Sequence, residues 1–223
     1  MSPIHTAVLA LAFGLSGTAG AATIVEWNLQ NTPGNQATTA GTASQESVMA
    51  DDLARGAGLN ATGAANSFSS SGWNGAATDY FSFGFSLDDG FFANLDSLYI
   101  GTRSSGTGPG TLGLFWNGDD FSTALTAFSQ STNTFVNSIV DLGALPDLTG
   151  DVEFRLVQIG TTSANGGTTA TGGTFRVTGY FQGGTFDRNM QFTGTVSAIP
   201  EPGTVALLLA GLATVGFVAR RRG

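Results

Sequence analysis

Three aspartate doublets are the side chains whose type and spacing first suggest chemistry. Two of the doublets stand beside a glycine. Carboxylate oxygens on turns suit Ca²⁺, which takes about six to eight oxygen ligands. Asp next to Gly is equally typical of a plain turn, and neither EF-hand nor RTX repeat spacing is present. The sequence leaves both hypotheses open, and apart from this ion no cofactor is expected. The doublets are Asp51-Asp52, Asp88-Asp89 and Asp119-Asp120, of which Asp88, Asp89, Asp119 and Asp120 are the calcium candidates.

The side chains of conventional hydrolases are missing from the chain. It contains no cysteine, and its one histidine is His5, which lies in a segment expected to be removed. Ser-His-Asp chemistry, cysteine nucleophiles, and zinc sites built on imidazole or thiolate are therefore excluded. Glu26, Glu46 and Glu153 show no spacing that singles out a pair for glycoside cleavage. A non-catalytic protein is predicted.

Aromatic side chains offer a second kind of site, because an exposed ring can stack on a sugar. Trp and Tyr combine a flat apolar face with a polar tip. Trp73 stands between Ser71-Gly72 and Asn74-Gly75, which favours an exposed loop, whereas Trp116 alternates with leucines and is expected in the core. The candidate glycan contacts are Trp73, Tyr99 and Tyr180, and the alternative for each is a structural role.

Charge narrows the choice of partners. Residues 23–199 carry five Arg and fifteen Asp or Glu, which gives −10, and the whole chain contains no lysine. A domain this acidic repels phosphates and anionic lipid. Nucleic acid is therefore excluded as a partner of this part.

The middle of the chain reads as all-β. Short apolar alternations recur between segments rich in Gly, Thr, Ser and Asn, and no long amphipathic helix is present. Phe81, Phe83 and Phe85 share one face of a strand. A single β-sandwich over residues 22–198, most consistent with a jelly roll, is predicted. The expected strands are Thr23–Leu29, Tyr80–Ser86, Ser97–Gly101, Thr111–Trp116, Thr134–Val140, Asp151–Ile159, Thr174–Phe181 and Met190–Val196.

Several segments stay ambiguous at this level. Met49–Leu59 fits either one helical turn or a strand and loop. Polar loops are expected at Gln30–Ser47, Gly101–Gly110 and Gly160–Gly173. Loops this long are usually functional or disordered, and the sequence leaves both open.

Both ends of the chain resemble targeting segments. Ile4–Leu15 is apolar and Ala19-Gly20-Ala21 matches a signal peptidase site, so residues 1–21 are predicted to be a signal peptide. Residues 203–219 carry no charge and as a helix would measure about 26 Å, close to a bilayer's apolar core. Arg220, Arg221 and Arg222 follow, and are expected to hold that end in the cytoplasm.

The tail resembles the PEP-CTERM sorting signal of Gram-negative bacteria. The residues that carry the resemblance are Pro200-Glu201-Pro202, the transmembrane helix 203–219 and Arg220-Arg221-Arg222, within a predicted sorting segment 199–223. The resemblance implies processing by an exosortase, in organisms that build exopolysaccharide or matrix. The same tail is also labelled an ice-binding-protein C-terminal motif, but the chain lacks the regular Thr-x-Thr ladder of an ice-matching face.

Together these features predict an exported, non-catalytic protein of the cell envelope or extracellular matrix. The alternative is a carbohydrate- or calcium-binding surface adhesin of the exopolysaccharide matrix. Expected partners are signal peptidase, an exosortase-type enzyme, the cytoplasmic membrane through the tail helix, and exopolysaccharide. The expected location is the cytoplasmic membrane before processing, and the surface or matrix of a Gram-negative bacterium afterwards.

Overall fold

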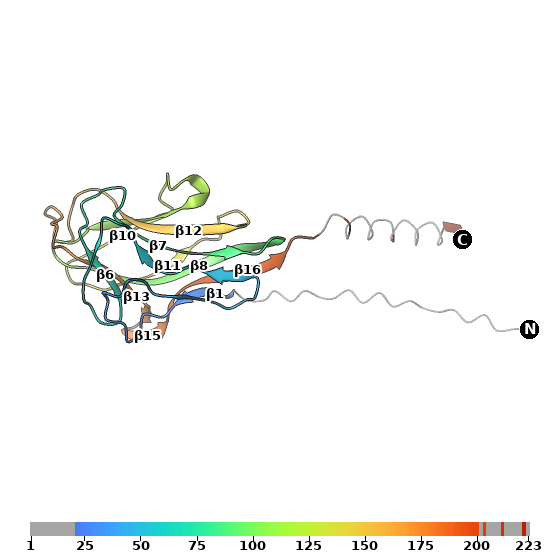
Figure 1. Ribbon diagram of the computed structural model, residues 1–223, viewed down its shortest axis with the longest axis horizontal. Coiled ribbons are helices and arrows are strands. Elements are labelled where there is room, and N and C mark those ends of the chain that lie inside the picture. Colours follow the sequence, from blue (N-terminus) through green and yellow to red (C-terminus); the bar gives the residue numbers. More distant parts are fainter. Residues whose placement is uncertain (1–20, 201–202, 204–210, 212–219, 222–223) are drawn as a thin grey trace, which may run out of the picture.

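Antiparallel strands form almost all the regular structure in the computed structural model, which describes residues 21–200, 203, 211, 220 and 221 (Figure 1). The all-β prediction is therefore confirmed. The elements are β1 (Ala22–Trp27), β2 (Gly41–Ala43), β3 (Val48–Ala50), β4 (Ala54–Arg55), β5 (Asn60–Ala61), β6 (Phe68–Ser71), β7 (Tyr80–Leu87), β8 (Phe91–Ser104), β9 (Thr111–Trp116), the 3-10 turn η1 (Asn117–Asp119), β10 (Thr126–Ser129), β11 (Val136–Asp141), β12 (Asp151–Gln158), β13 (Phe175–Thr178), β14 (Tyr180–Gln182), β15 (Thr185–Arg188) and β16 (Met190–Ala198).

Two sheets face each other. The first has the order β2-β1-β16-β8-β13-β6-β5, with β11 also paired to β8, and the second has the order β10-β9-β12-β7-β3, with β4 also paired to β7. We call them the β8 sheet and the β12 sheet. The orders β1-β16-β8-β11 and β7-β12-β9-β10 within them are those expected if the sandwich is a jelly roll.

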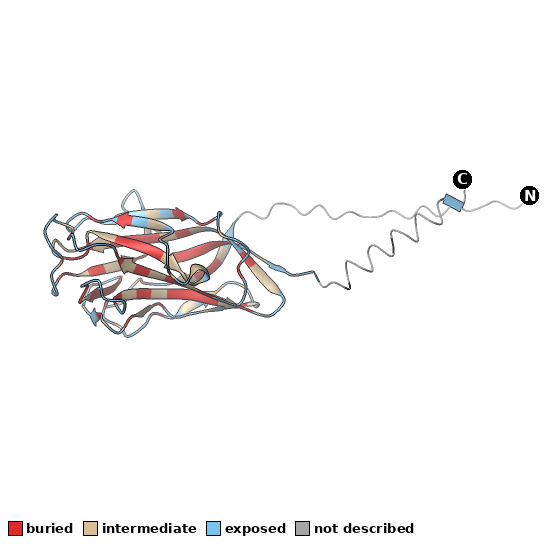
Figure 2. Cartoon of the chain, turned by 90° about the horizontal axis from the view of Figure 1, so that it is seen from above, coloured by how far each residue is buried: buried red, intermediate tan, exposed pale blue. Residues whose placement is uncertain are grey.

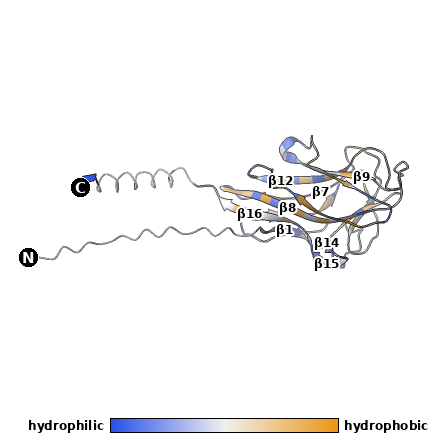
Figure 3. Ribbon diagram, turned by 180° about the vertical axis from the view of Figure 1, so that it is seen from behind, coloured by the Kyte–Doolittle hydropathy of each residue, from blue (hydrophilic) through white to orange (hydrophobic). Residues whose placement is uncertain are grey.

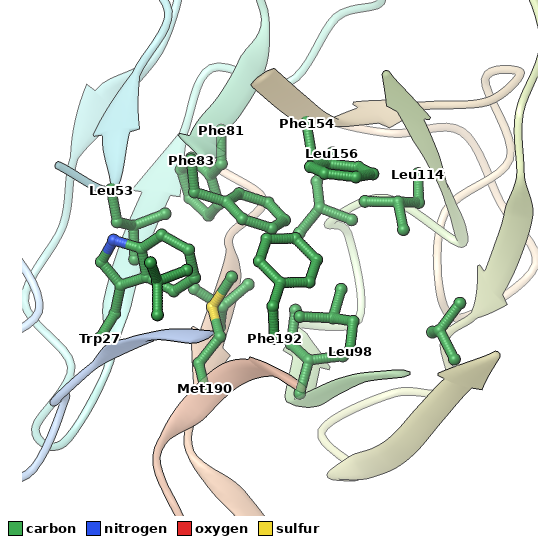
Figure 4. Packing of buried hydrophobic residues seen from close by; sticks show 14 of the residues in the cluster. Trp27, Leu53, Phe81, Phe83, Leu98, Leu114, Phe154, Leu156, Met190 and Phe192 are labelled. Carbon is green, nitrogen blue, oxygen red and sulfur yellow. The ribbon is translucent and has the colours of Figure 1, made fainter. Parts of the chain in front are cut away.

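Aromatic rings meet at the centre of the interior and are surrounded by aliphatic side chains, as Figure 4 shows. The alternation predicted for β7 is confirmed, since Phe81, Phe83 and Phe85 are all buried. From the β8 sheet, Trp27 meets Phe83 edge-on at 5.4 Å, and Phe192 lies 4.7 Å from Phe154 of β12. Burying one such ring contributes about 1.5–3 kcal/mol, so these contacts stabilise the packing of the two sheets. Figure 2 shows the buried positions concentrated along the central strands.

Some segments differ from the prediction. Thr174–Phe181, expected as one strand, is divided at Gly179 into β13 and β14. The segment Met49–Leu59 contains β3 and β4 with a loop between them, so the strand-and-loop alternative holds. The loop 160–173 is bonded to the loop after β8, since the amide of Ala164 donates to the Gly108 carbonyl at 3.0 Å.

Both ends of the described sandwich lie at one end of the molecule (Figure 1). Ala22 at the start of β1 pairs with Gly194 of β16, and Ala198 pairs with Phe91 at the start of β8. The predicted signal peptide and tail helix fall almost wholly outside the described residues, as do Glu201, Pro202 and Arg222. Among the residues that are described, no helix is long and apolar enough to span a membrane.

Candidate functional site

A β-hairpin covers part of the outer face of the β8 sheet. Both β13 and β16 pair with the edge of β8 opposite β11, β16 along residues 91–99 and β13 along residues 101–104. The residues between β13 and β16 form the hairpin β14–β15. Figure 3 shows this hairpin on the side of β8 that faces away from β12. The chain crosses β8 at Gly101, where an added Cβ would lie 2.2 Å from Thr178 Oγ1 and 2.4 Å from the Gly179 oxygen. The hairpin therefore requires a residue without a side chain at this point of β8.

Two adjoining clefts lie on this outer face beside the hairpin. The apolar cleft has a volume of about 290 Å³ and the polar cleft about 190 Å³. Phe135 joins them, because its ring lines the apolar cleft and contacts two arginines of the polar cleft. We call the pair of clefts the outer groove. The apolar cleft is lined by Ala65, Asn66, Phe135, Asn137, Thr178, Phe181 and Gly184, and the polar cleft by Thr62, Gly63, Ala64, Ser69, Arg103, Ser105, Asn133, Thr174 and Arg176.

The hairpin forms one wall of the groove, and a hydrogen bond from the hairpin backbone to β11 holds this wall in place. The amide of Phe181 donates to Asn137 Oδ1 on β11 at 3.0 Å. The Phe181 ring also meets Phe186 of β15 edge-on at 5.7 Å. Phe135, which is 47% exposed, stands at the end of the apolar cleft. The groove thus presents aromatic faces next to amide groups.

The floor of the polar cleft carries two neighbouring arginines. Arg103 of β8 pairs directly with Arg176 of β13. Their guanidinium carbons lie 4.9 Å and 5.0 Å from the centre of the Phe135 ring. Burial, and next the charge of Arg103, lower the pKa of Arg176. The cleft therefore combines two positive charges with the hydroxyl and amide groups around them.

Two predicted glycan contacts, Tyr99 and Tyr180, come together on the same outer face. Their rings meet edge-on with centroids 5.4 Å apart, and Arg188 lies over Tyr99 at 4.3 Å. Both tyrosines are half-buried. They lie at the base of the hairpin, where Arg188 covers one face of Tyr99, and their role in glycan binding stays a prediction.

Trp73, the third predicted contact, is fully buried. Its Nε1 donates to the Ser70 carbonyl at 3.0 Å, and its ring packs edge-on against Phe81 at 5.2 Å and Phe175 at 5.5 Å. The prediction of an exposed tryptophan is wrong. Gly72, directly after β6, has a φ of +92°, a conformation that favours glycine, and the buried Trp73 follows it.

The calcium candidates lie in two separate turns. Asp88 and Asp89 are exposed between β7 and β8. The Asp119 carboxylate accepts bonds from the amides of Ser122 and Thr123, as a turn-forming aspartate does. In the described part of the chain, no three Asp, Glu, His or Cys side chains gather as a metal site. Calcium binding stays a prediction.

An acidic cleft lies on the β12 sheet. It is lined by Asp51, Asp52, Asp151 and Glu153, together with Ser82, Phe83, Asn117 and Val152. Burial raises the pKa of Asp51, and the charges of Asp151, Glu153 and Asp52 raise it further. Glu153 is paired with Arg155 at 2.7 Å, as their shared strand face predicts. The charged form of Asp51 therefore costs stability at neutral pH.

The outer groove was not predicted from the sequence. The alternation of side chains along β8 and β13 places Arg103 and Arg176 on the outward faces of their strands, and this alternation is present in the sequence. Their adjacency depends on the pairing of strands about seventy residues apart, which no local pattern reveals. Phe135 and Phe181 lie in segments expected as strands, where a ring is normally interpreted as core.

The tail is defined by a comparison with known families. A family model for the PEP-CTERM protein-sorting motif matches residues 198–222. The chain carries a PEP-CTERM sorting motif. This PEP-CTERM motif begins at Ala198, the last residue of β16, and implies an exported protein that an exosortase-type enzyme processes at the membrane. Pro200, Arg220 and Arg221 are its described charged or proline residues, and all three are exposed.

Comparisons over the whole chain provide less information about function than the match of the tail. No curated protein matches it. Two solved structures of mutant forms of CBM29-2, a family 29 carbohydrate binding module, are similar at 14% sequence identity. One has a TM-score of 0.38 over 71% of this chain and 88% of that one, and the other 0.37 over 79% and 92%.

Proposed function

We propose that this chain is an exported, non-catalytic protein of the bacterial surface or extracellular matrix that binds polysaccharide in the outer groove. In this proposal a jelly-roll sandwich is the binding domain. The segment 1–21 directs export and is removed by signal peptidase. The helix 203–219 spans the membrane until an exosortase-type enzyme processes the tail.

One observation carries the binding role: the outer groove places partly exposed aromatic rings beside amides and hydroxyls. Phe135 and Phe181 offer apolar faces, and Asn66 and Asn137 border the same cleft. Sugar rings have apolar faces and a rim of hydroxyls, so they suit a surface of this kind. The apolar cleft alone approaches the lower end of the roughly 300–1,000 Å³ typical of small-ligand sites.

The position of the groove supports display at a surface. The sorting motif leaves the sandwich at Ala198, which pairs with Phe91. Arg103 lies twelve residues further along the same strand, a distance of about 40 Å at roughly 3.3 Å per residue. A protein held by its tail would therefore carry the groove at its far end.

The lining of the groove supports a binding role without catalysis. None of the residues that line the two clefts is Asp, Glu, His or Cys. The groove therefore offers neither a carboxylate pair nor a nucleophile with its base, the groups that glycoside or acyl cleavage would need.

Affinity electrophoresis of the full-length chain, purified in mild detergent, tests the proposal against a panel of neutral and acidic polysaccharides. We expect retardation by at least one polymer and its loss in Phe181→Ala, which removes a cleft wall. Phe121→Ala is the matched control, because this ring lies against Arg155 on the β12 sheet. Mobility unaffected by every polymer, or equal retardation of wild type and Phe181→Ala, would refute the proposal.

A further inference from the structure

We propose that Arg103 and Arg176 form a carboxylate-binding site, and that the polysaccharide bound in the outer groove is acidic, with uronic acid residues. The inference rests on the proposed function, since it names the class of polymer that the groove binds. It starts from two arginines that face each other across adjacent strands and have no acidic partner among the residues that the structure describes.

The pair is unlike the other arginines of the sandwich. Arg103 and Arg176 contact the Phe135 ring, but within the described residues neither makes a hydrogen bond or an ion pair through its side chain. Each of the other three donates to oxygen. The acceptors include the Gly34, Gln36 and Ser69 carbonyls for Arg55, and are Glu153 for Arg155 and Asp187 for Arg188. The two guanidinium groups that line this cleft carry ten N–H donors in all, and none of these donors has a hydrogen-bond acceptor among the described residues.

The arrangement is unfavourable in the absence of a ligand. Like charges directly opposite each other in a sheet are destabilising, because their Cβ atoms lie only about 4.5–5.5 Å apart. Partial burial of Arg176 adds to the cost. Residues 23–199 include fifteen acidic residues and only five arginines, so an acidic residue beside this pair could have neutralised its charge. A bound anion would supply the missing charge and the missing acceptors.

The chemistry of the cleft favours a carboxylate on a sugar. A guanidinium group is planar and binds a carboxylate through two parallel hydrogen bonds. Phe135 lies against both guanidinium groups and also lines the neighbouring apolar cleft. A uronate in the polar cleft would thus place the next sugar of the polymer beside Phe135 and Phe181. The hydroxyls of Thr62, Ser105 and Thr174 and the amide of Asn133 surround the anion position.

Carboxyl reduction gives a sharper test than salt. The domain carries a net charge of −10 between residues 23 and 199, so salt would screen both the local attraction and the overall repulsion of a polyanion. Reduction of the polymer's carboxyl groups removes only the proposed contact and leaves the sugar backbone. The full-length chain in mild detergent is therefore measured against polygalacturonate, alginate and hyaluronan, each with its carboxyl-reduced form.

We expect at least one uronate polymer to bind about tenfold or more tightly than its reduced form. Arg103→Gln and Arg176→Gln should each abolish this preference and leave binding of the reduced polymer unchanged. Arg155→Gln, which removes the same charge from the other sheet, should keep the preference. Both groove variants should melt at or above the wild-type temperature, because each removes a like-charge contact, so lost binding would not reflect unfolding.

The outcomes separate the two proposals. Equal binding of intact and reduced polymers, or a preference that survives both substitutions, overturns the carboxylate site and leaves the polysaccharide groove in place. Absence of binding to every polymer overturns both. Arginine-dependent binding that is tighter to dextran sulfate than to all three uronate polymers contradicts the carboxylate assignment. Arginine-dependent binding to poly-glutamate as tight as to any polysaccharide would instead assign the site to acidic protein segments.

Discussion

Replacing Gly101 by alanine should displace the hairpin and damage the outer groove. The added Cβ would lie 2.2 Å from Thr178 Oγ1 and 2.4 Å from the Gly179 oxygen, whereas such contacts rarely fall below 3.0 Å. The carbonyl belongs to the backbone and cannot rotate away, so the crossing chain must lift. Overpacking of this kind costs about 1–3 kcal/mol. At about 2–4 °C per kcal/mol for a domain of this size, the midpoint should fall by about 2–12 °C.

Calorimetry and polysaccharide affinity electrophoresis together measure this effect. We expect Gly101→Ala to lower the melting temperature and also to weaken retention, because the lifted hairpin would draw Phe181 away from Asn137. Gly172→Ala is the control, since an added Cβ there meets no atom within 4 Å. Adding Thr178→Ala should restore only part of the loss, because the Gly179 oxygen remains. A melting temperature within about 1 °C of wild type, with normal retention, would refute the reasoning.

Three further predictions concern the core, the acidic cleft and the tail. Trp73→Ala should cost about 3–5 kcal/mol in denaturant unfolding and leave polysaccharide binding by the folded fraction unchanged; specific loss of binding would contradict its burial. Asp51→Asn should raise the melting temperature at pH 7, because the raised pKa of this acid means that its charged form destabilises the fold. This gain in melting temperature should vanish as the pH falls below 3.8, the ordinary pKa of the acid in the unfolded chain. A gain that grows on acidification would contradict the reasoning. Changing Arg220, Arg221 and Arg222 to Gln should leave precursor unprocessed or mis-sorted in cell fractions, and normal processing would count against the orientation argument.

The parts of the fold that depend on local pattern could be predicted from the sequence. Alternation in β7 and β12 assigned the buried faces correctly, because one face of each strand has to pack against the other sheet. Alternation also placed Glu153 and Arg155 on one solvent face, and they form an ion pair there. The match at residues 198–222 likewise follows from a short contiguous signal.

The parts that depend on contacts between distant residues could not be predicted. Trp73 has only small polar neighbours in sequence, yet Phe81 and Phe175 form its pocket. The strand expected over residues 174–181 breaks at Gly179, because the chain there crosses β8 over Gly101. Such crossings are determined by the packing of other strands, and the residues near the crossing in the sequence do not predict them.

The acidic character of the domain and the arginine pair together offer a physical basis for specificity. Three of the five arginines between residues 23 and 199 are already bound to protein oxygens, and the remaining two lie side by side. Elsewhere the surface repels a polyanion, so unspecific contacts are weakened more than the contact at the groove. The same two arginines lie far along β8 from Ala198, where the tail begins. A polyanion would then be attracted chiefly to the end of the sandwich that lies away from the tail. Repulsion by the remaining surface would restrict its binding to that end.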